Sequence, residues 1–136
     1  SGNWGGLLTN PGVVMANAIA SMIDKNGKIL VEGWRNTNIP GSVRSAIAKL
    51  EVGEGENTPQ INPFWGEPDM TPGERVFGSN TFEVRAFETG NPKSPANAIP
   101  PSAIVYGHLR YVVGTRVDQL MPLLRAHLDR HGFQDI

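Results

Sequence analysis

The sequence of 136 residues predicts an α+β fold, in which helices cover one face of an antiparallel sheet. Two observations support this class. Residues 81–89 and 102–113 alternate along the chain as strands do, and a proline-rich loop separates them. Residues 11–23, 42–50 and 115–132 repeat apolar side chains at helical spacing. Because 39% of the residues are hydrophobic, we expect residues 1–136 to form a single compact domain.

The first helix is predicted from Pro11 to about Ile23. Asn10 is a favourable N-cap residue, and proline suits the first helical position. The helix should end at the turn 24–27, whose glycine can adopt a positive φ, and residues 28–31 should be extended. The turn resembles part of a calcium-binding loop. Such a loop needs a glycine at its sixth position and a glutamate at its twelfth, and this segment has neither.

A second helix is predicted from Ser42, its cap, to about Leu50. Residues 51–80 are rich in glycine and proline and are predicted to form a long loop inside the domain. Loops of that length are uncommon in compact domains. We therefore expect this one either to be functional or to be pinned by its isolated aromatic residues, Phe64 and Trp65.

The two predicted strands each present two different faces. In residues 81–89, one face would carry Phe82, Val84 and Ala86, and the other Glu83, Arg85 and Phe87. In residues 102–113, an apolar face would pack under helices and carry Ala103, Val105, Gly107, Leu109, Tyr111 and Val113. The other face is mixed and would carry Ile104, Tyr106, His108, Arg110 and Val112. A mixed face is typical of a sheet surface that is open to solvent or to a ligand.

The last helix is predicted to be capped by Thr115 or Asp118 and to end at Gly132. Pro122 favours a start near Asp118, since proline disrupts a helix interior. Residues 133–136 have the pattern of a beginning strand.

The order of these elements is half of a βαββαβ, ferredoxin-like two-layer sandwich whose first strand is missing from residues 1–136. In a sheet ordered 2-3-1-4, that strand is central. Its absence would leave two rows of backbone donors and acceptors unpaired. We therefore expect another chain or segment to fill this position.

Composition excludes several function classes. With 12 basic and 13 acidic residues and no block of one sign, the sequence shows no electrostatic footprint for nucleic acid. No apolar run approaches the roughly 20 residues of a membrane helix, so we expect no membrane partner. The absence of cysteine excludes disulfides and thiolate metal sites, and we expect a cytoplasmic location.

The search for chemistry finds no catalytic residue and no metal site. His127 and His131 are four residues apart on a predicted helix, which permits metal chelation, but no third ligand is near in sequence. Histidines that complement a helix dipole are the simpler interpretation. His108 is expected to be a surface or interface residue. Phosphate-binding loops and nucleophile motifs are absent, so the residues alone indicate a binding or assembly module.

Two stretches of the sequence resemble a known family. The segment SGNWGGLLTNP, followed by a helix and DKNGKI, resembles the entry to the lid domain of dizinc exopeptidases and deacylases. This family includes carnosine dipeptidase, glutamate carboxypeptidase, acetylornithine deacetylase and succinyl-diaminopimelate desuccinylase. The segment ANAIPPSAIVYGHLRYVVGTRVDQLMPLLRAHL resembles the family's Asn-x-Ile-Pro…Arg strand and the helix after it. Residues 51–78 match the family poorly.

The resemblance implies a lid or dimerisation domain inserted in a catalytic domain that holds two zinc ions. The parent would be a hydrolase, a metallopeptidase that cleaves a peptide or an N-acyl amino acid, and this chain alone would be inactive. Lids of two subunits would pair edge to edge, with 81–89 as the edge strand of a homodimer. The family's lid histidine would stand directly before Ser1, and its zinc ligands have no counterpart here.

The same resemblance implies two substrate-binding residues. Arg110 would bind a substrate carboxylate, to which a guanidinium can donate two parallel hydrogen bonds, and Asn97 would bind the substrate or a developing oxyanion. Without the family context, Arg110 would be an exposed arginine paired with a glutamate, and Asn97 a turn residue before proline. The alternative function is a free-standing, ferredoxin-like small-molecule-binding or regulatory domain, whose ligand would lie near Tyr106, His108 and Arg110.

Overall fold

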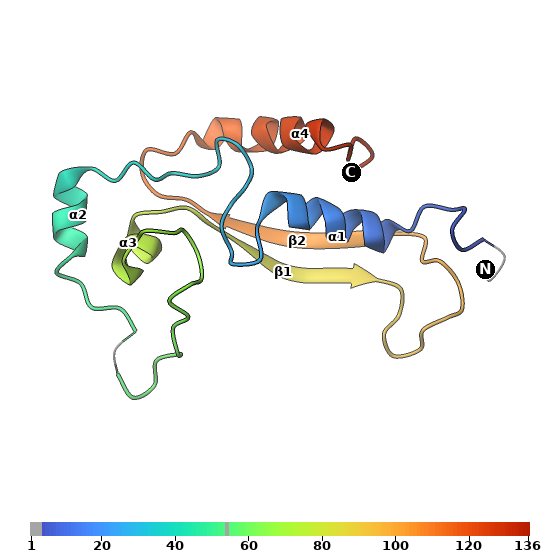
Figure 1. Ribbon diagram of the computed structural model, residues 1–136, viewed down its shortest axis with the longest axis horizontal. Coiled ribbons are helices and arrows are strands. Elements are labelled where there is room, and N and C mark those ends of the chain that lie inside the picture. Colours follow the sequence, from blue (N-terminus) through green and yellow to red (C-terminus); the bar gives the residue numbers. More distant parts are fainter. Residues whose placement is uncertain (1–3, 54) are drawn as a thin grey trace.

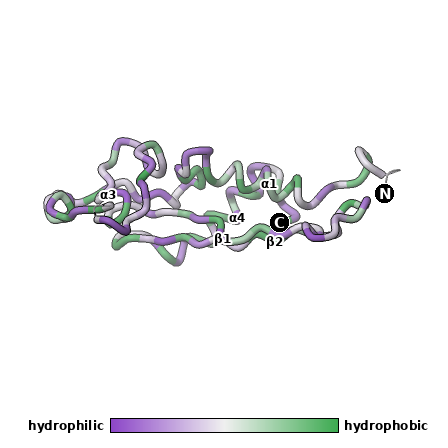
Figure 2. Tube along the Cα trace, turned by 90° about the horizontal axis from the view of Figure 1, so that it is seen from below, coloured by the Kyte–Doolittle hydropathy of each residue, from purple (hydrophilic) through white to green (hydrophobic). Residues whose placement is uncertain are grey.

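The computed structural model describes residues 4–53 and 55–136, and it confirms the α+β class. In Figure 1, α1 lies over one face of the two-stranded sheet, and α4 runs roughly parallel to β2 in this view. Seen from below, in Figure 2, α1 forms a layer separate from the strands. In chain order, the elements are α1 (Pro11–Met22), α2 (Gly41–Ile47), α3 (Pro72–Phe77), β1 (Thr81–Thr89), β2 (Ala103–Arg110), a 3₁₀ turn (Val117–Gln119) and α4 (Leu120–Arg130).

Helix α1 begins and ends nearly as predicted. The Asn10 side chain accepts hydrogen bonds from the backbone N–H groups of Gly12 (3.0 Å) and Val13 (3.4 Å), and proline occupies the first turn. After α1, the Asp24 carboxylate accepts from two backbone N–H groups of the following turn. This turn leads to a single antiparallel bridge between Ile23 and Ile29.

Helix α2 begins at Gly41, so the prediction of a Ser42 cap is wrong. The carbonyl of Pro40 already accepts from the N–H of Arg44 (2.9 Å), which places Ser42 inside the first turn. The helix also ends three residues before Leu50, at Ile47.

The prediction of a long loop over residues 51–80 is incomplete, because the segment contains α3. This short helix begins at a capping box, in which Thr71 Oγ1 accepts from the N–H of Glu74 and the Glu74 carboxylate accepts from the N–H of Thr71 (3.2 Å each). The pattern Thr-Pro-Gly-Glu is a helix-start signal. Because glycine and proline are also typical of loops, the composition around residues 71–74 favours a loop over a helix.

Only one of the two aromatic residues pins the loop. The Trp65 ring lies against Gly27, where an added Cβ would stand 2.6 Å from the ring, and Gly27 has a positive φ of 81°. Next to it, the N–H of Gly66 donates to the carbonyl of Asn26 (2.7 Å). Phe64, by contrast, is 80% exposed.

Two arginines, Arg35 and Arg75, also contact residues 63–67 of this segment. Arg35 donates to both carboxylate oxygens of Glu67, a side chain that is almost fully buried. The guanidinium of Arg75 donates to the carbonyls of Glu67 (2.9 Å) and Pro63 (2.8 Å). The segment is therefore attached to the body of the domain through backbone and charged contacts.

The hairpin contains a β-bulge that changes the predicted faces of β1. Val84 pairs with Gly107 and Ala86 with Tyr106, so Arg85 is an extra residue without a partner in the ladder. Beyond the bulge, Phe87 pairs with Val105 and joins the face that packs under α1. The assignment of Ala86 to that face is therefore wrong.

Strand β2 is shorter than the predicted 102–113, because the chain leaves the ladder after Arg110. Instead of continuing the pairing, the N–H of Val112 donates to the side chain of Asn80 (2.9 Å).

The start of α4 agrees with the Pro122 argument, since this proline lies in the first turn of the helix. The predicted caps are wrong: Gln119 precedes the helix without a side-chain cap, and the Asp118 carboxylate instead binds the side chains of Arg116 and Gln119.

The C-terminal residues 133–136 form a turn, not the beginning of a strand. The Arg125 side chain donates to the carbonyls of Phe133 (3.1 Å) and Ile136. These bonds turn the chain back onto α4.

The core lies where α1, α4 and the sheet meet, with Trp34 at its centre. The Trp34 indole N–H donates to the carbonyl of Leu120 (2.8 Å), and its ring lies 5.6 Å from that of Phe82. The buried core residues are Ala18, Met22, Ile29, Val31, Trp34, Phe82 and Leu128.

An apolar groove of about 430 Å³ runs between α1, α4 and the inner side of β2. Its lining includes Met15, Ile19, Val105, Leu109, Leu120 and Leu124. In the part of the chain that the structure describes, β2 pairs only with β1. The groove therefore lies beside a strand edge, where the sequence predicts an additional strand.

None of the helices in residues 4–53 and 55–136 has the length and apolar character needed to cross a bilayer.

Candidate functional site

The sheet face turned away from α1 is here called the open face. Its side chains follow from the register, because Phe82 and its partner Leu109 lie on the helix-covered face. The predicted mixed character is confirmed for β2, whose open-face side chains are all exposed. The open face carries Glu83, Arg85, Ala86 and Glu88 from β1 and Ile104, Tyr106, His108 and Arg110 from β2.

Arg110 lies at the end of β2, opposite Thr81, and is exposed. Its guanidinium makes one long hydrogen bond, to the carbonyl of Arg75 (3.5 Å). The simpler interpretation of this residue was a pair with a glutamate, but Arg110 forms no ion pair with the residues that the structure describes. Its charge is therefore available to an external anion.

A buried asparagine fixes the strand end that carries Arg110. The Asn80 amide oxygen accepts from the N–H of Val112 (2.9 Å) and the hydroxyl of Thr115 (3.2 Å). Its amide nitrogen donates to the carbonyl of Trp34 (2.9 Å). Sequence reasoning missed this role, because an asparagine before a strand has the pattern of an ordinary turn residue.

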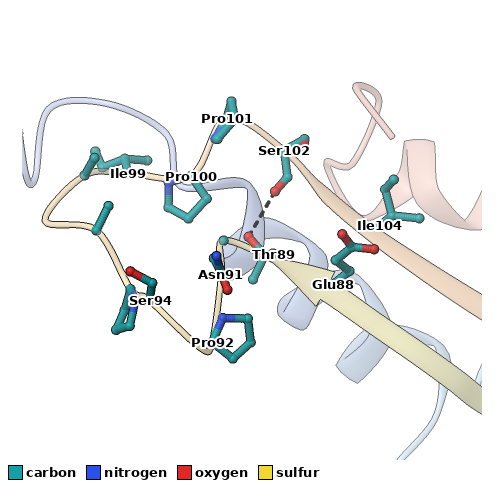
Figure 3. Close-up of a pocket in the computed structure, with 14 residues that line it drawn as sticks. Glu88, Thr89, Asn91, Pro92, Ser94, Ile99, Pro100, Pro101, Ser102 and Ile104 are labelled. Carbon is teal, nitrogen blue, oxygen red and sulfur yellow. Dashed lines mark hydrogen bonds between the residues drawn. The ribbon is translucent and has the colours of Figure 1, made fainter.

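Asn97 lies on the exposed loop that joins β1 to β2, and it interacts with other groups of the chain. The loop encloses an open pocket of about 560 Å³, and Ala96 and Ala98 contribute to its lining. Figure 3 shows the base of this pocket, where the Thr89 hydroxyl donates to the carbonyl of Ser102 (3.0 Å). The loop is thus closed at the strand ends and leaves Asn97 on the surface.

The two predicted site residues lie at opposite ends of the hairpin. A strand rises about 3.3 Å per residue, so the seven steps from Ala103 to Arg110 cover about 23 Å. Asn97 precedes Ala103 by six residues and lies in the loop beyond that end of β2. One copy of the domain therefore does not bring Asn97 and Arg110 onto the same small substrate.

The two helix-end histidines contact each other, and His127 is buried whereas His131 is exposed. His127 is buried, its Nε2 lies 2.9 Å from the hydroxyl of Ser21, and its ring stacks on that of His131 at 4.1 Å. His131 Nδ1 lies 2.8 Å from the carbonyl of His127. Burial lowers the pKa of His127 below its ordinary value of 6.5, and repulsion from His131 and Arg130 lowers it further.

No group of three or more metal-ligating side chains occurs among residues 4–53 and 55–136. The two histidines contact neighbouring groups of the protein, and no third ligand joins them from the residues that the structure describes.

Arg85 lies on the same face as Glu83, as the sequence predicts, and it also contacts His108, which the sequence does not indicate. Its Nη2 lies 3.3 Å from Nδ1 of His108. One feature of the sequence indicates the bulge that positions Arg85. Phe87 lies five positions after Phe82, an odd step that puts the two side chains on opposite faces of a regular strand, so both can pack under the same helix only if the strand contains an extra residue.

A model of the peptidase dimerisation domain matches residues 1–136. The M20 family metallo-carboxypeptidase Sso-CP2 from Sulfolobus solfataricus is similar in structure, with 22% identity and a TM-score of 0.76 over 96% of this chain and 31% of that chain. The dipeptidase Dug1p from Saccharomyces cerevisiae is also similar, with 18% identity and a TM-score of 0.69 over 96% of this chain and 28% of that chain.

No curated protein matches the chain. The chain spans less than a third of the length of either solved structure. At these identities, the two structures support the fold, and the match over residues 1–136 identifies the family. The chain belongs to the peptidase dimerisation domain family of the M20 metallopeptidases.

Proposed function

We propose that this chain is the dimerisation and lid domain of a zinc-dependent exopeptidase or deacylase that hydrolyses a peptide or an N-acyl amino acid. The observation that carries the proposal is the family match over residues 1–136. Both similar structures are of peptidases, which agrees with it. Arg110 adds an exposed cation without an ion-pair partner among the described residues.

The described residues of this chain do not fit a catalytic metal site, since no group of three ligands is present among them. Two zinc ions would be held by another domain, as the resemblance implies. The contribution of this chain is then to bind and orient the substrate, and no catalytic step is assigned to its side chains.

Arg110 is proposed to bind the substrate carboxylate. A guanidinium donates two parallel hydrogen bonds to a carboxylate, which fixes orientation as well as affinity. Asn80 supports this role by holding the strand end after Arg110.

Asn97 is proposed to bind the substrate of a different catalytic centre. Because Asn97 and Arg110 lie at opposite ends of the hairpin, one symmetric dimer would place them in two separate sites. Each site would then receive Arg110 from one subunit and Asn97 from the other.

Strand β1 is proposed as the dimer edge. Within the described chain, β1 pairs with β2 on one side only, and an unpaired edge can bind another strand. Val84 and Phe87 lie on the helix-covered face, yet they remain 41% and 43% exposed. A second subunit beside β1 would bury this apolar surface.

The test uses the full-length protein and a panel of dipeptides and N-acyl amino acids. Arg110→Ala should lower kcat/KM by about 10- to 100-fold, since it removes charge-assisted hydrogen bonds. Arg130→Ala, on α4, is the matched control and should leave kcat/KM unchanged. Wild-type values of KM and kcat for Arg110→Ala would contradict the carboxylate role.

The alternative, a free-standing ligand-binding domain, is distinguished by the flanking gene sequence. A histidine directly before Ser1 and metal-ligand motifs on either side support the proposal. A start codon near Ser1 and a stop codon shortly after Ile136 would oppose it. A cytoplasmic location remains a prediction from the absence of cysteine.

A further inference from the structure

The open face holds a second group of donors that the proposed function does not use. Arg85 is the residue that the bulge inserts into β1, and its Nη2 donates to Nδ1 of His108 across the strand pair (3.3 Å). With Nδ1 as the acceptor, the neutral imidazole carries its proton on Nε2. The bulge thus places an arginine and an imidazole N–H donor on the same surface as Arg110. Bulges often aim side chains in this way near functional sites.

The arginines of the chain differ in the partners that their guanidinium groups contact. Most form an ion pair with a carboxylate, and the guanidinium of Arg75 donates to two backbone carbonyls. Arg85 and Arg110 form no ion pair with any residue that the structure describes. The paired arginines are Arg35, Arg44, Arg116, Arg125 and Arg130. Three arginines therefore lack a carboxylate partner among the described residues. The guanidinium of Arg75 binds backbone carbonyls, and the other two, Arg85 and Arg110, lie on the open face.

The spacing of these donors suits one small ligand with two carboxylates. His108 and Arg110 are alternate residues of β2, so their Cα atoms lie about 7 Å apart on one face. Arg85 contacts the His108 end of this pair. Glu83 faces His108 across the strands and is the nearest open-face carboxylate by register. A ligand that binds here must overcome the repulsion of Glu83.

We propose that Arg85 and His108 form a second carboxylate site beside Arg110, so that the protein selects substrates whose released amino acid is glutamate or aspartate. The inference rests on the proposed function, in which Arg110 binds the α-carboxylate. Arg85 and the Nε2–H of His108 then bind the side-chain carboxylate. The substrate class is a peptide or N-acyl derivative with an acidic C-terminal residue.

The experiment compares N-acetyl-L-glutamate with N-acetyl-L-glutamine, which have nearly the same shape and differ by one charge. The full-length protein should hydrolyse the glutamate substrate with a kcat/KM higher by about tenfold or more, the effect of one charge-assisted hydrogen bond. Arg85→Gln should remove this preference by raising KM for the glutamate substrate alone. Glu83→Gln should increase the preference, since it removes a competing negative charge.

Arg130→Gln, which removes a cation of α4, is the matched control and should leave the preference unchanged. Equal kcat/KM for the two substrates, or an equal loss for both in Arg85→Gln, would overturn the second carboxylate site while leaving the proposed function intact. If neither these substrates nor the dipeptide panel is hydrolysed, the proposed function fails, and this inference fails with it.

Discussion

His127 is a single buried residue that ties α4 to α1. Its Nε2 lies against the Ser21 hydroxyl, which also donates to the carbonyl of Ala18 (2.6 Å). Burial and the nearby positive charges lower the pKa of His127, so the folded protein favours the neutral imidazole. The contact between these two helices should therefore depend on pH.

The first prediction concerns this dependence. Below pH 6.5, the unfolded chain binds a proton at His127 more readily than the folded chain does. The free energy of unfolding should therefore fall as the pH drops from 6.5 towards the lowered pKa. Urea unfolding at pH 7.5 and at pH 5 measures this loss, and His127→Gln should reduce it. An equal loss in both proteins would show that His127 does not cause it.

The second prediction concerns Asn80, which joins three segments through buried hydrogen bonds. Asn80→Ala leaves the carbonyl of Trp34 and the N–H of Val112 without this partner. It should lower the free energy of unfolding by about 1–3 kcal/mol. Asn17→Ala, at an exposed asparagine of α1, is the control and should change stability by less than about 0.5 kcal/mol. Equal effects of the two substitutions would contradict the role of Asn80.

At the scale of elements, the apolar groove and the edge of β2 indicate a place for one more strand. The groove is lined by side chains of α1, α4 and the inner face of β2. Every second backbone N–H of an antiparallel strand points away from its partner, so half of the β2 donors have no partner in β1. An extended segment beside β2 would satisfy these donors and cover the groove.

The third prediction is a hydrogen-exchange pattern. In the full-length protein, the β2 amides that point away from β1 should exchange as slowly as those bonded to β1, because an additional strand protects them. The outward amides of an exposed edge would exchange much faster than their neighbours. Such a two-residue alternation along residues 103–110 would contradict the added strand.

The elements with strong local signals were predictable from the sequence. Asn10 and Pro11 specify the start of α1, and alternation specifies both strands. The bulge was missed because period-2 assignment presumes an unbroken ladder, although the odd spacing of Phe82 and Phe87 indicates it. Helix α3 has only six residues, too few for apolar periodicity to appear.

Long-range contacts decide the features that the sequence did not show. Residues 133–136 turn back towards α4 because Arg125 donates to two of their carbonyls, and no local sequence pattern predicts these hydrogen bonds. The contact of Arg85 with His108 depends on the bulge. The separation of Asn97 from Arg110, by contrast, follows from strand length and could have been inferred before the structure.

At the scale of the whole molecule, that separation is the main constraint on function. The resemblance implies that both residues contact substrate, but about 23 Å of β2 lies between the loop and Arg110. A symmetric dimer resolves this conflict if each catalytic centre takes Arg110 from one subunit and Asn97 from the other. The family match to a dimerisation domain is consistent with such sharing.

The fourth prediction uses heterodimers of the full-length protein, purified through two different tags. When one subunit carries Arg110→Ala and the other Asn97→Ala, shared sites leave one centre with both defects and the other with none. When a single subunit carries both substitutions, sharing places one defect in each centre.

The activity of the first heterodimer tests the central claim most directly. We predict about half of the wild-type kcat for it, since one of two symmetric centres is intact, and little activity for the second heterodimer. The opposite result, with the first heterodimer as impaired as either single-variant homodimer and the second half-active, would show that Asn97 and Arg110 act in the same centre of one subunit and would contradict the account.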